Sequence, residues 1–252
     1  MKLTNNLKEV MECKDSARLK KFATSPNPDE RQFAAANKYI DEDTQMILTR
    51  DDKINVKKTL GINPSITRQV AEALIEDKNS NVKAAVIYNP NVAEEVKLAV
   101  YGTCLKDNPK EKDYLICTRA LAKCLKTPAM LKGLSHSTDC TTRIYAANNK
   151  YLPEDALNNM RTDVSAEIRV LVAQSPKTTP ETLKYLSEDS NFRVRRAVAE
   201  NENTPIEILQ NMADNAREPY FIINEAKINM ASRSVERDLE EVKDVDDIEA
   251  EI

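Results

Sequence analysis

The segment RVRRAVAENENTPIEIL at residues 193–209 aligns with EIRVLVAQSPKTTPETL at residues 167–183, and the alignment places Arg195 over Arg169. The same register followed backward meets a basic residue each time, at steps of 26, 26, 24, 36, 26 and 26 residues. This basic column comprises Arg31, Lys57, Lys83, Arg119, Arg143, Arg169 and Arg195. Self-similarity at a fixed period of this size is typical of stacked structural repeats. The longer step indicates an insertion of about ten residues near residues 102–113.

Two polar columns keep step with the basic one. Six residues before it stand Ser25, Asp51, Asp77, Asp113, Ser137, Asp163 and Asp189, and six residues after it stand Asn37, Asn63, Asn89, Leu125, Asn149, Ser175 and Asn201. We interpret the acidic and basic columns as a ladder in which each carboxylate meets a cationic group of its own or the next repeat. A direct ligand-binding role for the basic column is the alternative. Asparagine tolerates left-handed backbone, so its column is expected to end a helix.

The residues between the columns predict two helices in each repeat. Apolar residues one before and three after the basic position, such as Val194 and Val198, share one helical face. A second helix is expected to start at Thr127-Pro128, Leu152-Pro153, Thr179-Pro180 and Thr204-Pro205, where threonine caps and proline begins the helix. Thr204 and Glu207 also have capping-box spacing. Such a pair is too small to enclose a core, so the sequence predicts an all-α solenoid of about seven to eight stacked two-helix repeats.

The pattern RxxVAxNxxTPxxxL, carried by Arg195 to Leu209, resembles the leucine-rich repeat variant family, and the six-residue spacing from Asp to Arg is similar to that of HEAT repeats. The resemblance covers about residues 25–215. It implies a right-handed superhelix of short helices, some of them 3₁₀. One type of family member carries an N-terminal cysteine cluster for iron and sulfur. Only Cys13 precedes residue 100 in this chain, so we do not expect such an iron–sulfur cluster here.

Composition argues against catalysis and against cofactors. The chain has three glycines, whereas average usage of roughly 7% would give about 18, so glycine-rich phosphate loops are not expected. His136 is the single histidine, and it is read as a surface turn residue. We interpret Cys13, Cys104, Cys117, Cys124 and Cys140 as reduced, structural thiols. The sequence therefore predicts a non-enzyme with no metal and no cofactor.

Charge and hydropathy predict location and domain organisation. No run of about 18 apolar residues occurs, and the N-terminus is polar, so we expect a soluble cytoplasmic protein without a membrane segment. Residues 1–232 are predicted to form the solenoid, with terminal caps at 3–24 and 216–231, because the repeat register places Phe221 where a basic residue is expected. Residues 233–252 carry 3 basic and 9 acidic side chains. They are predicted to form an acidic tail that either aids solubility or docks onto the body or a partner.

The proposed partner-binding residues follow the basic column in adjacent repeats. Ile144, Tyr145, Val170 and Leu171 would form an apolar patch, and Arg193 and Arg196 would stand at its rim. Apolar side chains beside arginine are typical of protein contacts. The sequence therefore predicts a scaffold that binds a protein partner. The alternative is a nucleic-acid-binding solenoid whose acidic tail shields a basic groove.

Overall fold

The computed structural model describes the backbone of residues 5–106 and 111–249, and side chains over residues 7–104 and 112–234. Within these ranges the chain contains seventeen α-helices, one short 3₁₀ helix and no strand, which confirms the all-α prediction. The chain divides into two compact parts, residues 1–134 and 135–252. We call them the N-terminal part and the C-terminal part and describe each by itself.

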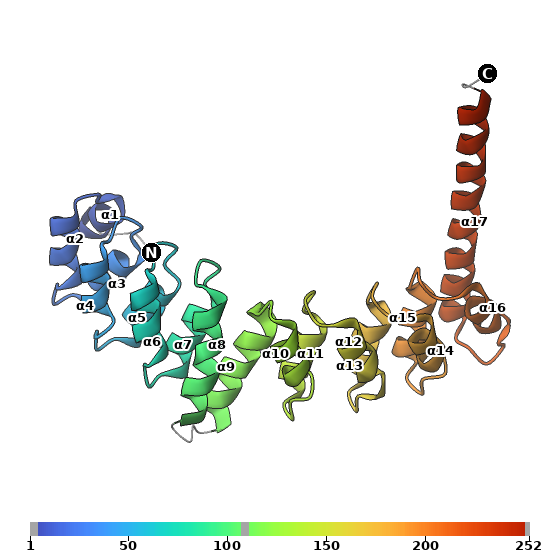
Figure 1. Cartoon of the computed structure of the whole chain (residues 1–252), viewed down its shortest axis with the longest axis horizontal. Helices are drawn as coiled ribbons and strands as arrows, with labels where there is room; N and C mark the ends of the chain where they lie inside the picture. Colours follow the sequence, from blue (N-terminus) through green and yellow to red (C-terminus); the bar gives the residue numbers. More distant parts are fainter. Residues whose placement is uncertain (1–4, 107–110, 250–252) are drawn as a thin grey trace. The chain divides into compact units, whose positions relative to one another are not determined.

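The N-terminal part consists of helix pairs. The pairs are α1 (Asn5–Glu12) with α2 (Ser16–Ala23), α3 (Pro28–Ala36) with α4 (Glu42–Leu48), α5 (Ile54–Gly61) with α6 (Arg68–Ile75), α7 (Ser80–Tyr88) with α8 (Glu94–Lys106), and α9 (Glu111–Cys124) with α10 (Pro128–Leu134). The first helices pack in series, α1 on α3, α3 on α5, α5 on α7 and α7 on α9 (Figure 1). The predicted cap at 3–24 thus holds a helix pair that packs as the later pairs do.

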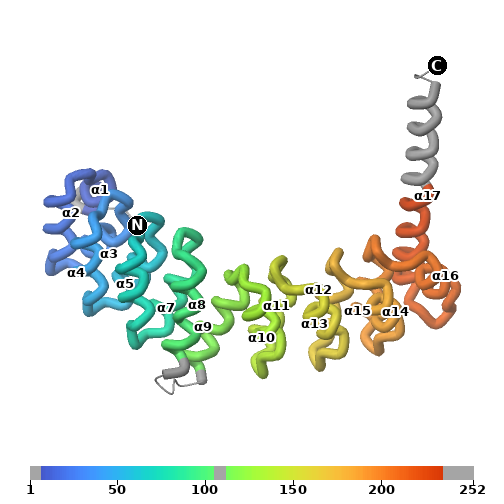
Figure 2. The backbone as a smooth tube through the Cα atoms, viewed as in Figure 1, coloured from blue at the N-terminus to red at the C-terminus, as the bar shows by residue number. Residues whose placement is uncertain are grey.

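The C-terminal part repeats this arrangement. Its helices are α11 (Cys140–Ala147), α12 (Glu154–Asn159), the 3₁₀ helix η1 (Met160–Thr162), α13 (Ala166–Gln174), α14 (Pro180–Ser187), α15 (Phe192–Glu200), α16 (Ile206–Asp214) and α17 (Tyr220–Glu249). Here α11 packs on α13, α13 on α15 and α15 on α17, with short loops between the helices (Figure 2). The second helix α14 contacts η1 and α16.

The core lies between neighbouring repeats. Ile168 and Val172 of α13 and Val194 and Val198 of α15 are fully buried, as the periodicity predicts. Leu183, Leu186 and Leu209 from the second helices are fully buried as well. Burying one such side chain stabilises the fold by about 1.5–3 kcal/mol. Because each helix pair is covered by the next, stability depends on stacking.

Helices α14 and α16 begin in different ways. Thr179 caps α14, since its hydroxyl accepts a hydrogen bond from the Thr182 amide and Pro180 follows it, as predicted. Thr204 does not cap α16, and the capping-box prediction is wrong. Its buried hydroxyl donates to the Val198 carbonyl at 2.6 Å, and α16 begins after Pro205. The hydroxyl of Thr178 donates to a carbonyl of α13 in the same way, so Thr204 aligns with Thr178 rather than with Thr179.

The last repeat is longer than the 26-residue register assumes. Glu218 supplies the acid for Arg195, and Asn229 takes the asparagine position, 28 residues after Asn201. Placing Phe221 in the basic column was therefore wrong. Helix α17 continues without a break across residues 232 and 233. The guanidinium of Arg233 donates to the carbonyls of Thr204 at 2.8 Å and Asn201 at 3.2 Å, so Arg233 belongs to the last repeat rather than to a separate tail.

Candidate protein-binding surface

The basic and acidic columns form ion pairs between successive repeats, which we call the charge ladder. In the C-terminal part the Nε–O distances are 2.7 Å for Arg143–Asp163, 2.6 Å for Arg169–Asp189 and 2.7 Å for Arg195–Glu218. In the N-terminal part, Arg31–Asp51 measures 2.6 Å and Lys57–Asp77 measures 2.5 Å. The predicted ladder is confirmed, and in each of these pairs the acid comes from the following repeat. Lys83 departs from it and donates to the Thr103 hydroxyl at 3.1 Å.

The ladder also binds backbone within each repeat. Nη1 of Arg169 donates to the Asp163 carbonyl at 2.8 Å, and the carboxylate of Asp189 accepts from the Asn191 amide at 2.8 Å. Burial acts to raise the pKa of Asp189, but hydrogen bonds from Arg169 and the Asn191 amide outweigh it and hold that pKa below its usual range. The charges and donors of these arginines are thus engaged in structural contacts. That arrangement favours the structural interpretation of the basic column over direct ligand binding.

The asparagine column forms a second, buried connection, which we call the asparagine ladder. Nδ2 of Asn201 donates to the carbonyls of Ala173 at 2.6 Å and Ser175 at 3.0 Å, and its Oδ1 accepts from the Asn203 amide at 2.8 Å. Asn63 and Asn89 make the same pair of bonds to the repeat before them. The backbone at Asn201 is extended, with φ −75°, so the expectation of left-handed backbone was wrong. A carboxamide suits the position at Asn201, because it supplies donors to two backbone carbonyls of the preceding repeat.

The predicted partner-binding residues lie on neighbouring first helices. Ile144 and Tyr145 are on α11, Val170 and Leu171 occupy the equivalent positions on α13, and all four side chains are half-buried. Arg193 and Arg196 lie on α15 and are exposed. The structure thus brings the apolar residues onto two first helices that pack against each other, with part of each side chain exposed.

An aromatic pair on this surface was not predicted. The rings of Phe192 on α15 and Phe221 on α17 meet edge to face with centroids 5.9 Å apart, although the residues are 47% and 42% exposed. The Arg196 guanidinium lies over the Phe221 ring, 5.9 Å from its centroid, and pairs with Glu200 at 2.8 Å. The apolar residue three places before Arg195 was the available signal for Phe192. We call Ile144, Tyr145, Val170, Leu171, Phe192, Arg193, Arg196 and Phe221 the first-helix surface.

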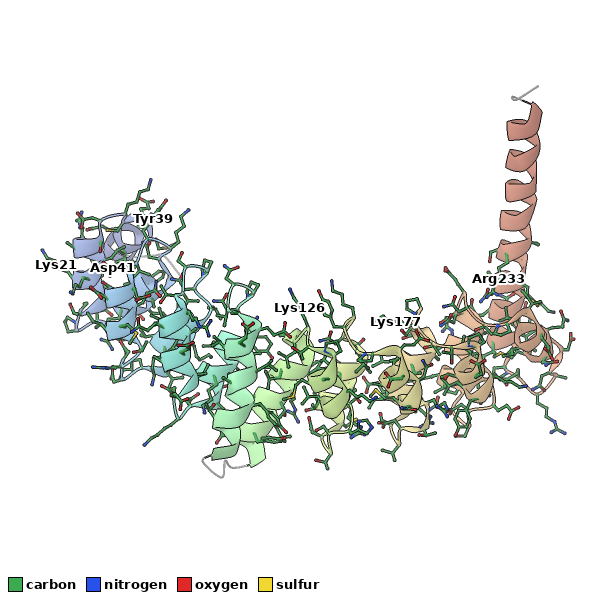
Figure 3. All side chains as sticks on the ribbon, in the orientation of Figure 1. Lys21, Tyr39, Asp41, Lys126, Lys177 and Arg233 are labelled. Atoms are coloured by element: carbon green, nitrogen blue, oxygen red, sulfur yellow. The ribbon has the colours of Figure 1, made fainter. Side chains whose placement is uncertain are left out.

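A hollow of about 270 Å³ adjoins this surface at Leu171. Its lining includes Ala147, Asn149, Leu157, Gln174 and Ser175. At its edge the Lys177 ammonium group donates to the carbonyls of Lys150 and Leu152. Lys177 and Arg233 lie along the upper edge of the C-terminal part in Figure 3. The signal for the hollow was Ser175, which stands in the asparagine column.

Metal binding and membrane insertion each require a particular arrangement of side chains. Over the parts of the chain that the structure describes, no group of three or more His, Cys, Asp or Glu side chains is placed to hold a metal ion. His136 is exposed, and its Nδ1 lies 3.2 Å from the Ser135 hydroxyl. Among the described helices, none combines the length and apolar character needed to cross a bilayer. Comparison of the chain with protein-family models and with curated proteins finds no match.

Proposed function

We propose that this chain is a non-catalytic cytoplasmic scaffold that binds a protein partner along the first-helix surface. The repeats form an α-solenoid with the right-handed superhelix that the leucine-rich repeat variant resemblance implies. The observation that carries the proposal is the cluster of Phe192, Phe221 and Arg196. Two exposed aromatic rings meet edge to face, and the Arg196 guanidinium lies over the ring of Phe221. Aromatic side chains and arginine are the residue types enriched at the energetic centres of protein interfaces.

The charges around the cluster indicate the chemistry of the partner. Arg193 is exposed, and its guanidinium forms no ion pair with any residue that the structure describes. A carboxylate of the partner at this point would gain a charge-assisted hydrogen bond. Apolar side chains of the partner would cover the two rings and the exposed parts of Ile144 and Val170. A segment that alternates apolar and acidic residues fits this surface best.

The charge ladder favours a protein partner over nucleic acid. A nucleic-acid groove requires cations whose charge is available to phosphate groups. Arg143, Arg169 and Arg195 each donate two hydrogen bonds to a carboxylate, and their side chains are only 12%, 15% and 18% exposed. These arginines therefore offer little charge to phosphate groups, and nucleic-acid binding is the second candidate, which is tested by truncation of the C-terminal residues.

Affinity capture from the native host with matched variants tests the proposal. Phe192→Ser together with Phe221→Ser should abolish capture of a stoichiometric protein partner while helicity is retained, because both rings are substantially exposed. The control replaces Tyr185 and Ile206, which are 53% and 44% exposed and belong to the second helices. That variant should capture the partner as the wild type does. Equal loss in both variants, or capture unaffected by the phenylalanine changes, would refute the proposed surface.

A further inference from the structure

The asparagine ladder has a gap that opens to solvent. The column asparagines are buried at Asn37, Asn63, Asn89 and Asn201 and half-buried at Asn149, whereas Ser175, which is half-exposed, has no carboxamide. Leu125 also replaces an asparagine, but its apolar side chain is itself fully buried. Serine is too short to reach the carbonyls of the preceding first helix. The hollow of about 270 Å³ beside Leu171 lies at this place.

The hollow contains the hydrogen-bond acceptors that an asparagine would use. Asn201 reaches the carbonyls 28 and 26 residues before it, and the same spacing from Ser175 identifies those of Ala147 and Asn149. Both residues line the hollow. No hydrogen bond to the Ala147 carbonyl occurs within the described residues, and Ala147 is the last residue of α11. A helix C-terminus leaves such carbonyls in need of a donor.

We propose that this hollow binds the carboxamide side chain of an asparagine or glutamine in the bound protein segment. This inference rests on the proposed function and specifies part of its recognition chemistry. The partner's NH₂ group donates to the Ala147 and Asn149 carbonyls, and its methylene groups pack against Leu171 and Leu157. The repeats themselves supply the precedent, because the carboxamide of Asn201 occupies the equivalent space in the next repeat.

Charge and size select a carboxamide over other side chains. A carboxylate would face the Ala147 and Asn149 carbonyl oxygens, which repel it, while the nearby Lys177 ammonium group is already engaged by the carbonyls of Lys150 and Leu152. A second ammonium or guanidinium group would meet Lys177, whose ammonium group already lies at the edge of the hollow. Sites for drug-sized ligands occupy roughly 300–1,000 Å³, so a hollow of about 270 Å³ suits one side chain.

NMR titration of the full chain with three matched probes tests the inference. The probes are the N-acetyl methylamides of asparagine, aspartate and leucine, which differ only in the side chain. The asparagine probe should give saturable shifts at the methyl groups of Ala147, Leu157 and Leu171, with a Kd at least threefold below that of either other probe. Equal binding of the leucine probe, preference for the aspartate probe, or no saturable shift with any probe would overturn the inference.

Exchanging two residues provides the internal control. Ser175→Asn supplies the carboxamide from within, so it should abolish the shifts and raise the melting temperature. Asn201→Ser should open a second hollow and create new shifts at the Ala173 methyl group. Shifts that persist in Ser175→Asn would contradict the site even if Asn201→Ser fails to fold.

The two proposals fail in different ways. Phe192→Ser with Phe221→Ser lies outside the hollow and should leave the probe shifts unchanged, while Ser175→Asn should weaken partner capture severalfold. Partner capture without carboxamide binding would overturn this inference and leave the scaffold proposal standing. If the hollow binds the asparagine probe but no protein is captured, the scaffold proposal is refuted. The inference that a partner's side chain occupies the hollow is then refuted as well.

Discussion

At the residue scale, two kinds of side chain join neighbouring repeats: an arginine that contacts the following repeat and an asparagine that contacts the preceding one. Arg169 extends forward to Asp189, 20 residues later, and Asn201 extends backward to carbonyls 28 and 26 residues earlier. Both connections satisfy groups that the helix ends leave without partners. Their loss should therefore cost more than the loss of a surface ion pair.

Asp189→Ala should lower the free energy of unfolding by about 1–3 kcal/mol, because it leaves the Arg169 guanidinium and the Asn191 amide without their acceptor. The side chain of Asp189 is 6% exposed and that of Arg169 is 15% exposed, so water replaces the lost carboxylate poorly. Urea unfolding followed by circular dichroism measures the change. Glu188→Ala, one residue earlier and exposed, is the control and should have little effect. Equal stability of the two variants would refute a structural role for the ladder.

Acid should weaken the charge ladder. Burial acts to raise the pKa of Asp163 and Asp189, but the hydrogen bonds they accept outweigh it and lower both pKa values in the folded state. A lowered folded pKa gives stability that is complete above the unfolded pKa of about 4 and is lost as pH falls below it. Unfolding at pH 7 and pH 3 should therefore show a larger loss for the wild type than for Asp163→Asn with Asp189→Asn. Parallel losses would show that these carboxylates do not govern the acid response.

The polar columns were predictable from sequence because similar repeats make the same contacts with their neighbours. The role of each column was harder to predict, because it depends on which groups its side chains reach in the folded protein. Paired acidic and basic residues have an obvious electrostatic use, so the ladder followed from the acidic and basic columns, whose members Arg169 and Asp189 form one of the pairs. Asparagine has two common uses, left-handed backbone and carboxamide bonding, and sequence spacing does not separate them. The hollow at Ser175 was missed for the same reason. Its meaning depends on what asparagine does in the neighbouring repeats.

At the scale of the helices, the first helices perform two tasks at once. Ile168 and Val172 of α13 are fully buried, while Val170 and Leu171 on the same helix are half-buried and reach the surface. A helix with 3.6 residues per turn can divide its side chains in this way. The adjacency of the apolar residues was thus predictable from sequence, whereas the contact between Phe192 and Phe221 involves the last repeat, where the 26-residue register fails.

Cysteine reactivity should follow position on the helices. Cys140 begins α11 and is exposed. Cys117 on α9 is buried, and its hydrogen bond with Cys104 together with burial raises the pKa of its thiol. The thiolate is the reactive form, so iodoacetamide at pH 7.5 should label Cys140 rapidly and Cys117 only after unfolding. Peptide mass spectrometry over time measures both sites. Prompt labelling of Cys117 in the folded chain would contradict this packing.

At the scale of the whole molecule, the terminal residues separate the two functional proposals. Removing residues 235–252 deletes 9 acidic and 2 basic side chains and retains Arg233 with the last repeat. Under the scaffold proposal, the truncated protein should still ignore random DNA and RNA in low-salt gel shifts, since ladder cations remain engaged. Partner capture should be unchanged. Tight, salt-sensitive binding of nucleic acid would instead establish the nucleic-acid alternative.

The distances along the sequence that the charge ladder and the asparagine ladder span also determine which changes in repeat number the gene for this protein can tolerate. A regular copy presents an acid to the repeat before it, a guanidinium to the repeat after it, and carbonyls to the asparagine that follows. Duplication or deletion of one whole 26-residue copy between regular neighbours therefore restores every contact at both junctions. A partial insertion breaks them, unless a longer side chain such as Glu218 spans the added distance. Whole-copy changes in the gene thus adjust the length of the repeat array without any new kind of contact at the junctions.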